Sequence, residues 1–257
     1  MAYSAGALKM LAEWVGSILP FGGRVLELGS QDINRDVGED VIREALSRIH
    51  GPNVDLDALI QEHSLGSESR KIASLFEGSS IGYSAIDLYA GHRVSVADLN
   101  TFSVAEGDRG TIDLVTNFGT SEHVADQINV FRVVHDFVKP NGHMFHTVPF
   151  AGYYNHGLYN YHPVFFFFLA WANNYRIITL NLSSPHLPHS IPVVDWLPGS
   201  NHWKSIRIES GMVSCLLQKI ENKPFALFTD LDRSVIKADE EPDKYRVLEG
   251  RYDLRVR

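Results

Sequence analysis

Residues 24–32, Arg-Val-Leu-Glu-Leu-Gly-Ser-Gln-Asp, constrain the fold more than any other stretch of the chain. They form a short apolar strand pattern that stops at Gly29 and carries an acid, Glu27, two residues before that glycine. In many α/β folds a strand, an acid and a glycine turn in this order present backbone amides and one carboxylate to a nucleotide-like ligand. Many other buried strands also end in Leu-Gly, so the rest of the chain has to supply the other walls of such a site.

Two further apolar stretches also finish at an acid. Residues 83–88 contain Asp87, and residues 93–99, after a short link, contain Asp98. In a doubly wound sheet the ligand crevice lies at the carboxyl ends of the strands, where these acids would gather. Any one of them alone is better explained as a helix N-cap or a turn residue. The set of three favours a ligand site.

A strand–helix–strand unit follows. Residues 112–117 predict a fourth strand, the apolar residues between Val124 and Val138 recur at helical spacing, and residues 143–150 predict a fifth strand. The connection should be right-handed. The sixth and seventh strands are expected at 175–182 and 212–220.

We expect one domain over residues 1–257, because a chain of this length with 44% hydrophobic residues can bury a full core. Its parts are an N-terminal helical segment (1–22, with the helix at 5–19), a helical insertion (35–80), substrate-side loops and a helix (150–205), and a charged tail (230–257). Within the insertion, helical patterns lie at 37–49, 56–63 and 67–76. The insertion is longer than a crossover requires, and a surface or oligomer role is favoured over a lid.

Six stretches occur in an order typical of one family: Val25-Leu26-Glu27-Leu28-Gly29, Ala85-Ile86-Asp87, Val96-Ala97-Asp98-Leu99, Asp113-Leu114-Val115-Thr116-Asn117, Glu122-His123-Val124 and Val138-Lys139-Pro140-Asn141-Gly142. With them, residues 24–150 resemble the class I, seven-stranded S-adenosylmethionine-dependent methyltransferases. The Glu-His pair, followed by a helix and a Lys-Pro-x-Gly turn, is the most specific part. The resemblance implies an α/β fold with a doubly wound, mostly parallel seven-stranded sheet, helices on both faces and an antiparallel last strand.

The resemblance also implies S-adenosylmethionine as cofactor. Its methionine portion would be held by the carboxylate of Glu27 and by backbone groups. The backbone groups are those of Gly29, Ser30, Gln31, Asn117 and Phe118. Two departures from the family pattern bear on this geometry. Gln31 stands where a second glycine is usual, so the backbone would approach the cofactor less closely. The helix between the second and third strands is nearly absent.

The adenosine portion would be held by the ends of the second and third strands. The resemblance implies that Asp87 accepts hydrogen bonds from the ribose hydroxyls and that Leu88 packs on the adenine. Asp98 would accept from the adenine amino group, and the Leu99 amide would reach a ring nitrogen.

Residues 152–163 occupy the family's usual position for acceptor contacts. Their tyrosines can stack on a ring or a sugar face, and His156 or His162 could act as a base. A packed aromatic loop that caps the next helix is an equal alternative. His123, which follows the fourth strand, is the first candidate base. The Glu122-His123 pair accompanies unrelated acceptors in the family, so a structural role is its alternative.

Composition excludes several classes of protein and of partner. A net charge of −8 argues against nucleic acid as the main partner. The single Cys215 excludes a disulfide framework and a multi-cysteine zinc site and fits a cytoplasmic protein. The N-terminus lacks the features of a signal peptide, and the longest apolar run, 164–172, is too short to span a membrane.

The loop at 183–203 is rich in proline and histidine. His186, His189 and His202 show no zinc-site spacing, so no metal is expected, and a flap carrying Asp195-Trp196 is favoured.

We therefore predict a cytoplasmic enzyme, free of nucleic-acid and membrane partners, that methylates a small-molecule acceptor. O-methylation of a hydroxylated metabolite or sugar is the favoured reaction, and a homo-oligomer is an option. The alternative is a non-catalytic binding or scaffold protein with a methyltransferase-like fold. A nicotinamide-dependent oxidoreductase is disfavoured because neither a full Gly-x-Gly-x-x-Gly nor a Tyr-x-x-x-Lys motif occurs.

Overall fold

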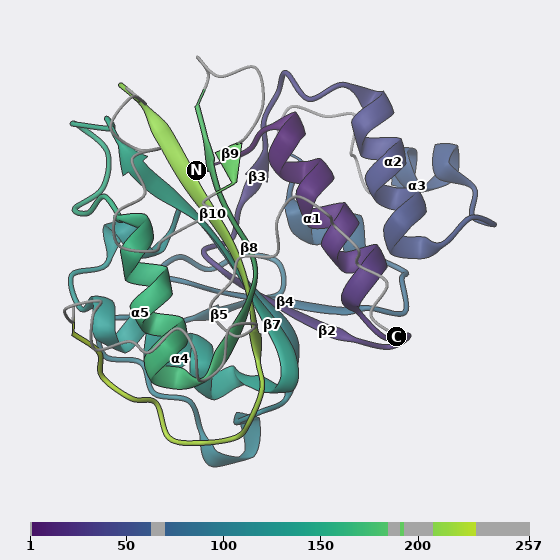
Figure 1. Ribbon diagram of the computed structural model, residues 1–257. Coiled ribbons are helices and arrows are strands. Elements are labelled where there is room, and N and C mark those ends of the chain that lie inside the picture. The colour runs from purple at the N-terminus through teal and green to yellow at the C-terminus, as the bar shows by residue number, and fades with distance from the viewer. Residues whose placement is uncertain (1, 63–69, 185–190, 193–207, 230–257) are drawn as a thin grey trace. The chain divides into compact units, whose positions relative to one another are not determined.

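The computed structural model describes residues 2–62, 70–184, 191–192 and 208–229 (Figure 1). The predictions for the start of the 67–76 helix, for His186, His189, His202 and Asp195-Trp196, and for the tail at 230–257 fall outside these residues. The chain forms two compact units. One runs to Asp98 and adds Ile112–Phe118; the other contains Leu99–Thr111 and continues from Gly119.

The sheet of the first unit consists of four parallel strands. They are β2 (Arg24–Leu28), β4 (Gly82–Asp87), β5 (Val94–Val96) and β6 (Ile112–Phe118), in the order β5-β4-β2-β6. Every residue of β6 is buried, as is all of β2 except Arg24. Near-continuous burial is typical of parallel strands covered on both faces. All four strands match the sequence-based expectation.

The helices of the first unit are α1 (Ala5–Ile18), α2 (Glu39–His50), α3 (Leu56–Glu62) and the 3₁₀ helix η1 (Ile72–Phe76). Helix α1 starts at the N-cap Ser4, whose hydroxyl accepts from the Ala7 amide at 3.4 Å. It lies beside α2 (Figure 1), and both helices bury an apolar stripe. The helix expected over 67–76 is present in its described part as the 3₁₀ helix η1 at 72–76. Residues 70 and 71 are extended instead, because Ile33 N donates to Arg70 O (2.9 Å) and Ile72 N donates to Gln31 O (3.1 Å).

Two strands of two residues each, one before α1 and one after β2, were not predicted. β1 (Ala2–Tyr3) pairs in parallel with β3 (Asp32–Ile33). This pairing places the Tyr3 ring on Phe118, with 4.1 Å between centroids and 19° between planes. The N-terminus thereby covers the end of β6.

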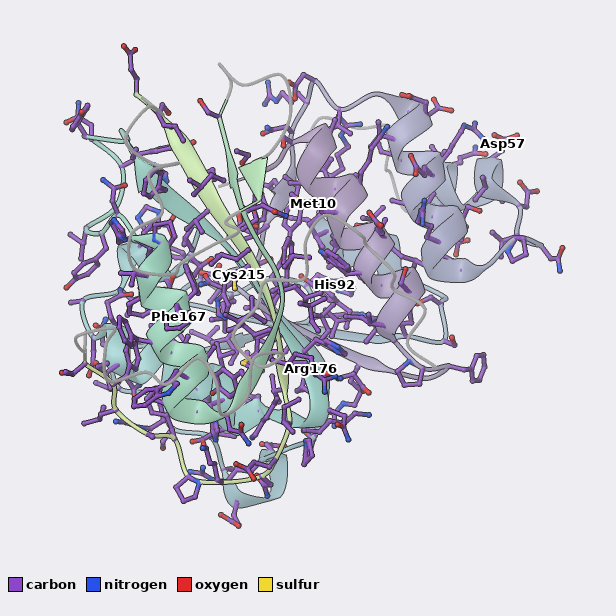
Figure 2. All side chains as sticks on the ribbon, in the orientation of Figure 1. Met10, Asp57, His92, Phe167, Arg176 and Cys215 are labelled. Atoms are coloured by element: carbon purple, nitrogen blue, oxygen red, sulfur yellow. The ribbon has the colours of Figure 1, made fainter. Side chains whose placement is uncertain are left out.

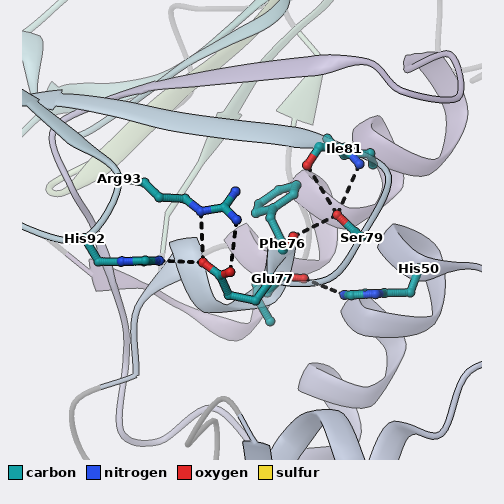
Figure 3. A network of polar contacts seen from close by, with 8 residues as sticks. His50, Phe76, Glu77, Ser79, Ile81, His92 and Arg93 are labelled. Atoms are coloured by element: carbon teal, nitrogen blue, oxygen red, sulfur yellow. Dashed lines mark hydrogen bonds and ion pairs between the residues drawn. The ribbon is translucent and has the colours of Figure 1, made fainter.

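Glu77 anchors the short link between β4 and β5 (Figure 3). Its carboxylate accepts from His92 Nε2 at 2.6 Å and from Arg93 Nη2 at 2.9 Å. Burial favours the neutral form of Glu77, but the His92 hydrogen bond and the Arg93 charge outweigh it and lower its pKa below the ordinary value. Next to it, the Ser79 hydroxyl donates to the carbonyls of Phe76 and Ile81. These contacts hold the link in place without a helix between β4 and β5.

The second unit contains a four-stranded antiparallel arrangement. Its strands are β7 (Val138–Ala151), β8 (Tyr175–Ser183), β9 (Ile191–Pro192) and β10 (Gly211–Lys219), in the order β7-β10-β8-β9. β10 runs antiparallel to both β7 and β8 and carries the buried Cys215 (Figure 2). β7 begins earlier than predicted, at Val138, and β9 was not predicted.

The helices of this unit are the 3₁₀ turns η2 (Glu106–Asp108) and η3 (Ser121–His123), with α4 (Gln127–Phe137) and α5 (Pro163–Asn173). α4 begins later than expected because Ser121–His123 forms a separate turn and Asp126 caps the helix by accepting from Asn129 N at 2.9 Å. Its end is closed by Lys219, whose buried Nζ donates to the carbonyls of His135 (2.8 Å) and Val138 (2.9 Å). Such donors satisfy carbonyls that have no partner within the helix.

The expected α/β fold is confirmed: the sheet is mixed and mostly parallel, the C-terminal strand β10 is antiparallel, and helices surround it. None of the described helices is long and apolar enough to cross a bilayer.

Candidate functional site

Glu27 lies near the carboxyl end of β2 and is completely buried. Its Oε2 accepts two hydrogen bonds, from the Tyr83 hydroxyl at 2.5 Å and from the Gln31 amide at 3.1 Å. Among the described residues its Oε1 has no hydrogen-bond partner. Burial raises the pKa of Glu27 to about 7, against the lowering effect of these two donors. A buried acceptor atom without a donor is costly, so this carboxylate fits a ligand that brings a donor or a positive charge.

Two tyrosines that the sequence analysis did not single out surround Glu27. Tyr83 stacks on Phe76, with 4.9 Å between ring centroids, so its hydroxyl is held toward the carboxylate. Tyr3 is fully buried, and burial, followed by the charge of Glu27, raises its pKa well above the ordinary value. The position of Tyr3 depends on the β1–β3 pairing, which no sequence pattern signals.

The turn after β2 is tied to the end of β4 through Asp87. Gly29 has φ of +75°, a conformation that favours glycine, and its amide donates to Ile86 O at 2.7 Å. The Ser30 amide then donates to Asp87 Oδ2 at 2.7 Å, and the Tyr89 amide donates to Asp87 Oδ1 at 3.0 Å. A carboxylate offers about four acceptor positions, so both oxygens of Asp87 retain capacity for ligand hydroxyls.

The predicted cofactor residues of the first unit gather at one edge of its sheet. The register places Leu28 opposite Ile86 on one side and opposite Asn117 on the other, which brings the ends of β2, β4 and β6 together. Asn117 and Phe118 are buried there. Leu88, which follows β4, is 60% exposed, and Asp98, beyond β5, is also exposed.

The loop that follows Gln31 is held by hydrogen bonds from the Arg70 side chain. Its Nη2 donates to the carbonyls of Asn34 (2.6 Å), Arg35 (2.9 Å) and Val37 (3.0 Å). Arg70 could not be singled out from the sequence, because an arginine that binds backbone carbonyls leaves no spacing pattern. Gln31 itself is 5% exposed, and its backbone amide is directed to Glu27. The turn is therefore rigidly supported although the second glycine is missing.

The second unit brings together Glu122, His123 and His156. The Glu122 side chain is 0% exposed, and its Oε1 lies 4.0 Å from His123 Nε2 and 3.8 Å from His156 Nε2. The two imidazole rings meet edge to face, with centroids 4.8 Å apart. Burial raises the pKa of Glu122 to about 7, and burial followed by the nearby His156 lowers the pKa of His123.

The backbone around His156 is fastened to Glu122. The Leu158 amide donates to the Glu122 carbonyl at 2.6 Å, and the His156 amide donates to Tyr153 O at 2.9 Å. Gly157 has φ of +72°, and a Cβ at this position would lie 2.8 Å from Glu122 Cγ. Only glycine allows this close approach.

His162 and Leu99 have other positions in the second unit. His162 is the N-cap of α5, where its Nδ1 accepts from Val164 N at 3.4 Å, and it is not a member of the cluster of Glu122, His123 and His156. Pro163 at the first helical position was the sequence signal for this cap. Leu99 is 5% exposed, and its carbonyl accepts from Asn129 Nδ2 at 2.8 Å.

Comparison with solved structures gives distant likenesses. The [4+2]-cyclase SpnF is 11% identical with a TM-score of 0.48, and the match covers 84% of this chain and 82% of that chain. The 1,6-didemethyltoxoflavin-N1-methyltransferase of Burkholderia thailandensis, solved with bound 1,6-didemethyltoxoflavin and S-adenosylhomocysteine, is 12% identical with a TM-score of 0.46. The match covers 84% of this chain and 79% of that chain. Geranyl diphosphate methyltransferase in complex with S-adenosylmethionine is 10% identical with a TM-score of 0.44, covering 84% and 90%.

A comparison with curated proteins gives no significant match. The family described as "Methyltransferase domain" matches residues 15–182, which is more than half of the chain. The match spans β2, β4, β5 and β6 with the Glu27 turn, and it continues through the cluster of the second unit. The chain belongs to the methyltransferase domain family and is an S-adenosylmethionine-dependent methyltransferase with the class I fold.

Proposed function

We propose that the protein methylates an oxygen atom of a small hydroxylated molecule, a metabolite or a sugar. The observation that carries this proposal is the cluster of Glu122, His123 and His156. A hydroxyl becomes a good nucleophile only when its proton leaves, whereas an amine or carboxylate acceptor needs no strong base. Two imidazoles set against a buried carboxylate are a suitable group to remove that proton.

On the donor side, the first unit offers what the methionine portion of the cofactor requires. Glu27 Oε1 is a buried acceptor without a partner among the described residues, and the α-ammonium of the cofactor would supply both charge and donors. Asp87 would accept the ribose hydroxyls, and the exposed Leu88 would be covered by the adenine. Asp98 and the Leu99 amide complete the proposed adenine contacts. When bound, the cofactor supplies an electrophilic methyl group that its sulfur releases as the acceptor oxygen attacks.

On the acceptor side, only residues 119–121 separate Phe118 from Glu122 in the chain. The loop that carries His156 also exposes aromatic rings, with Tyr154 93% and Tyr159 40% exposed. Such rings stack on a flat ring or a sugar face. The net charge of −8 favours a small acceptor over a nucleic acid. The single cysteine, Cys215, fits action in the reducing cytoplasm.

The test is methyl transfer from a donor carrying a deuterated methyl group to matched pairs of hydroxyl and amine acceptors, followed by mass spectrometry. We expect the label on oxygen. His123→Ala and His156→Ala should each reduce turnover about 100-fold or more, the usual contribution of a proton acceptor. His92→Ala is the matched control and should keep wild-type turnover. Label only on amines, or full turnover in both cluster variants, would contradict the proposal.

A further inference from the structure

We infer that Glu122, His123 and His156 form a site for one divalent transition-metal ion, and that this ion holds oxygen atoms of the acceptor. The ion-binding part stands on the geometry of the second unit alone. The acceptor part rests on the proposed function. This inference departs from the expectation of a metal-free protein, which considered the histidines of the 183–203 loop.

The first observation is a buried carboxylate with nothing to balance it. Glu122 has a 0% exposed side chain, and among the described residues neither of its side-chain oxygens has a hydrogen-bond partner. The Nε2 atom of His156 is buried next to it and also has no hydrogen-bond partner there. An uncompensated buried carboxylate is costly, and a cation between these atoms would remove the cost.

The second observation is the spacing of the three side chains. Glu122 Oε1 lies 4.0 Å from His123 Nε2 and 3.8 Å from His156 Nε2, which is too long for charge-assisted hydrogen bonds. The ligand atoms of all three residues lie within 4.8 Å of one another. Two ligands that each sit about 2.1 Å from a metal are separated by at most about 4.2 Å. The spacing thus suits an ion between the side chains, after a small rotation of the half-exposed imidazoles.

The third observation is that the backbone fixes this arrangement. Glu122 and His123 belong to the 3₁₀ turn η3, and Leu158 N binds the Glu122 carbonyl at 2.6 Å. Gly157 lets the chain approach so closely that a Cβ there would lie 2.8 Å from Glu122 Cγ. Tyr161 adds support from the same loop, since its hydroxyl lies 2.8 Å from the Ser121 Oγ. Metal sites depend on such support for their ligands.

The ligand types indicate the class of ion. Imidazole nitrogens favour Mn²⁺, Fe²⁺, Co²⁺, Ni²⁺ or Zn²⁺ over Ca²⁺ and Mg²⁺, which prefer oxygen ligands. Two imidazoles and one carboxylate leave coordination positions open, and an acceptor hydroxyl with a neighbouring oxygen can occupy them. With the ion bound, both imidazoles act as ligands and no longer as the proton acceptor of the proposed function. Coordination instead lowers the pKa of the hydroxyl, so its proton passes to solvent. The oxygen then forms its bond to the methyl carbon while the carbon–sulfur bond of the donor breaks, leaving S-adenosylhomocysteine.

The ion is tested by calorimetric titration of chelator-treated full-length protein with Mn²⁺, Co²⁺ and Zn²⁺ in turn. We expect one ion per chain. His156→Ala and Glu122→Gln should weaken binding at least tenfold, while the matched control His92→Ala should bind like the wild type. Circular dichroism shows whether each variant is folded, and the partly exposed His156 keeps the test valid if the buried Glu122→Gln does not fold. Absence of binding, or wild-type affinity in His156→Ala, would overturn the metal site.

Measuring ion binding and hydroxyl methylation on the same protein separates the metal site from the proposed function. If ions bind as expected but no hydroxyl acceptor is methylated, the metal site stands and the proposed function fails. If chelator-treated protein methylates hydroxyl acceptors at the full rate and re-added Co²⁺ or Mn²⁺ changes nothing, the proposed function stands and the ion's role on the acceptor is refuted.

Discussion

Glu27→Gln tests whether the buried carboxylate of Glu27 lowers the free energy of unfolding of the ligand-free protein. Burial raises the pKa of Glu27 from an ordinary value of 4.5 to about 7. Between these pH values the folded protein binds more protons than the unfolded chain, so its stability falls as pH rises. The stabilising contribution of the protonated form is fully present below the unfolded pKa and is lost by the time pH passes the folded pKa.

The size of the effect follows from the two pKa values. A change from 4.5 to about 7 corresponds to about 3 kcal/mol, and Glu27 is fully buried, so solvent does not screen it. Glutamine keeps an acceptor for the Tyr83 hydroxyl and the Gln31 amide but cannot ionise. Relative to wild type, the variant should therefore gain about 3 kcal/mol between pH 4.5 and pH 8. Without its charge it should bind S-adenosylhomocysteine about tenfold or more weakly.

The assay is urea denaturation of both proteins, free of ligand, at half-unit steps from pH 4.5 to pH 8, with calorimetry for ligand binding. Comparison with wild type cancels the titration of other groups. Glu77→Gln is the control of opposite sign, because the pKa of Glu77 is lowered in the folded state. A stability difference between wild type and Glu27→Gln that stays constant over this pH range would refute the reasoning, as would tighter ligand binding by the variant.

Three further perturbations follow from the structure. In urea denaturation, Gly157→Ala should lower the free energy of unfolding by at least about 1 kcal/mol more than Gly78→Ala does. Both glycines have φ of +72°, but only at Gly157 would a Cβ lie against Glu122. Equal losses of stability would contradict the close approach. Lys219→Met should destabilise the protein by about 1–3 kcal/mol, since two carbonyls lose their donor. Burial lowers the pKa of Lys219 from 10.5 to about 8, so between these pH values the unfolded chain binds more protons than the folded protein. The stability of the wild type relative to the variant should therefore rise from pH 8 to about pH 10.5. A fall over this range would contradict the reasoning. Arg70→Met should free the loop after β2 and weaken S-adenosylhomocysteine binding about tenfold without changing Co²⁺ affinity; unchanged ligand affinity would remove Arg70 from the support of that loop.

The main strands could be predicted because their local pattern and their final environment agree. β2 and β6 are apolar runs that the fold buries on both faces, and the glycine turn after β2 has the positive φ that its sequence indicates. The fold class followed from the family resemblance that these strands and acids carry.

Short elements created by tertiary contacts could not be predicted in this way. β1 and β3 each contain two residues, and they exist because the chain ends of distant segments pair. The apolar pattern at 67–76 fits a helix, but hydrogen bonds to Gln31 and Ile33 hold its start in an extended form. Tyr3 and Arg70 are placed at the cofactor turn by this pairing between segments that are distant in the sequence.

The cluster of the second unit was predicted in its members but not in its contacts. His123 and His156 were both candidates for a base, yet they lie far apart in the sequence. The positive φ of Gly157 and the Leu158–Glu122 hydrogen bond help to bring them together. A structural role was the alternative for the Glu122-His123 pair, and the structure buries the Glu122 carboxylate beside the two imidazoles. Burial of a carboxylate depends on the whole fold and has no local signature.

In our proposal, the carboxyl ends of β2, β4 and β6 hold the cofactor through Glu27 and Asp87. A crystal structure with S-adenosylhomocysteine bound would reveal whether they do. We expect the α-amino group at about 2.8 Å from Glu27 Oε1 and the ribose hydroxyls on Asp87. An amino group bound away from Glu27, with Oε1 still unpaired, would refute this assignment.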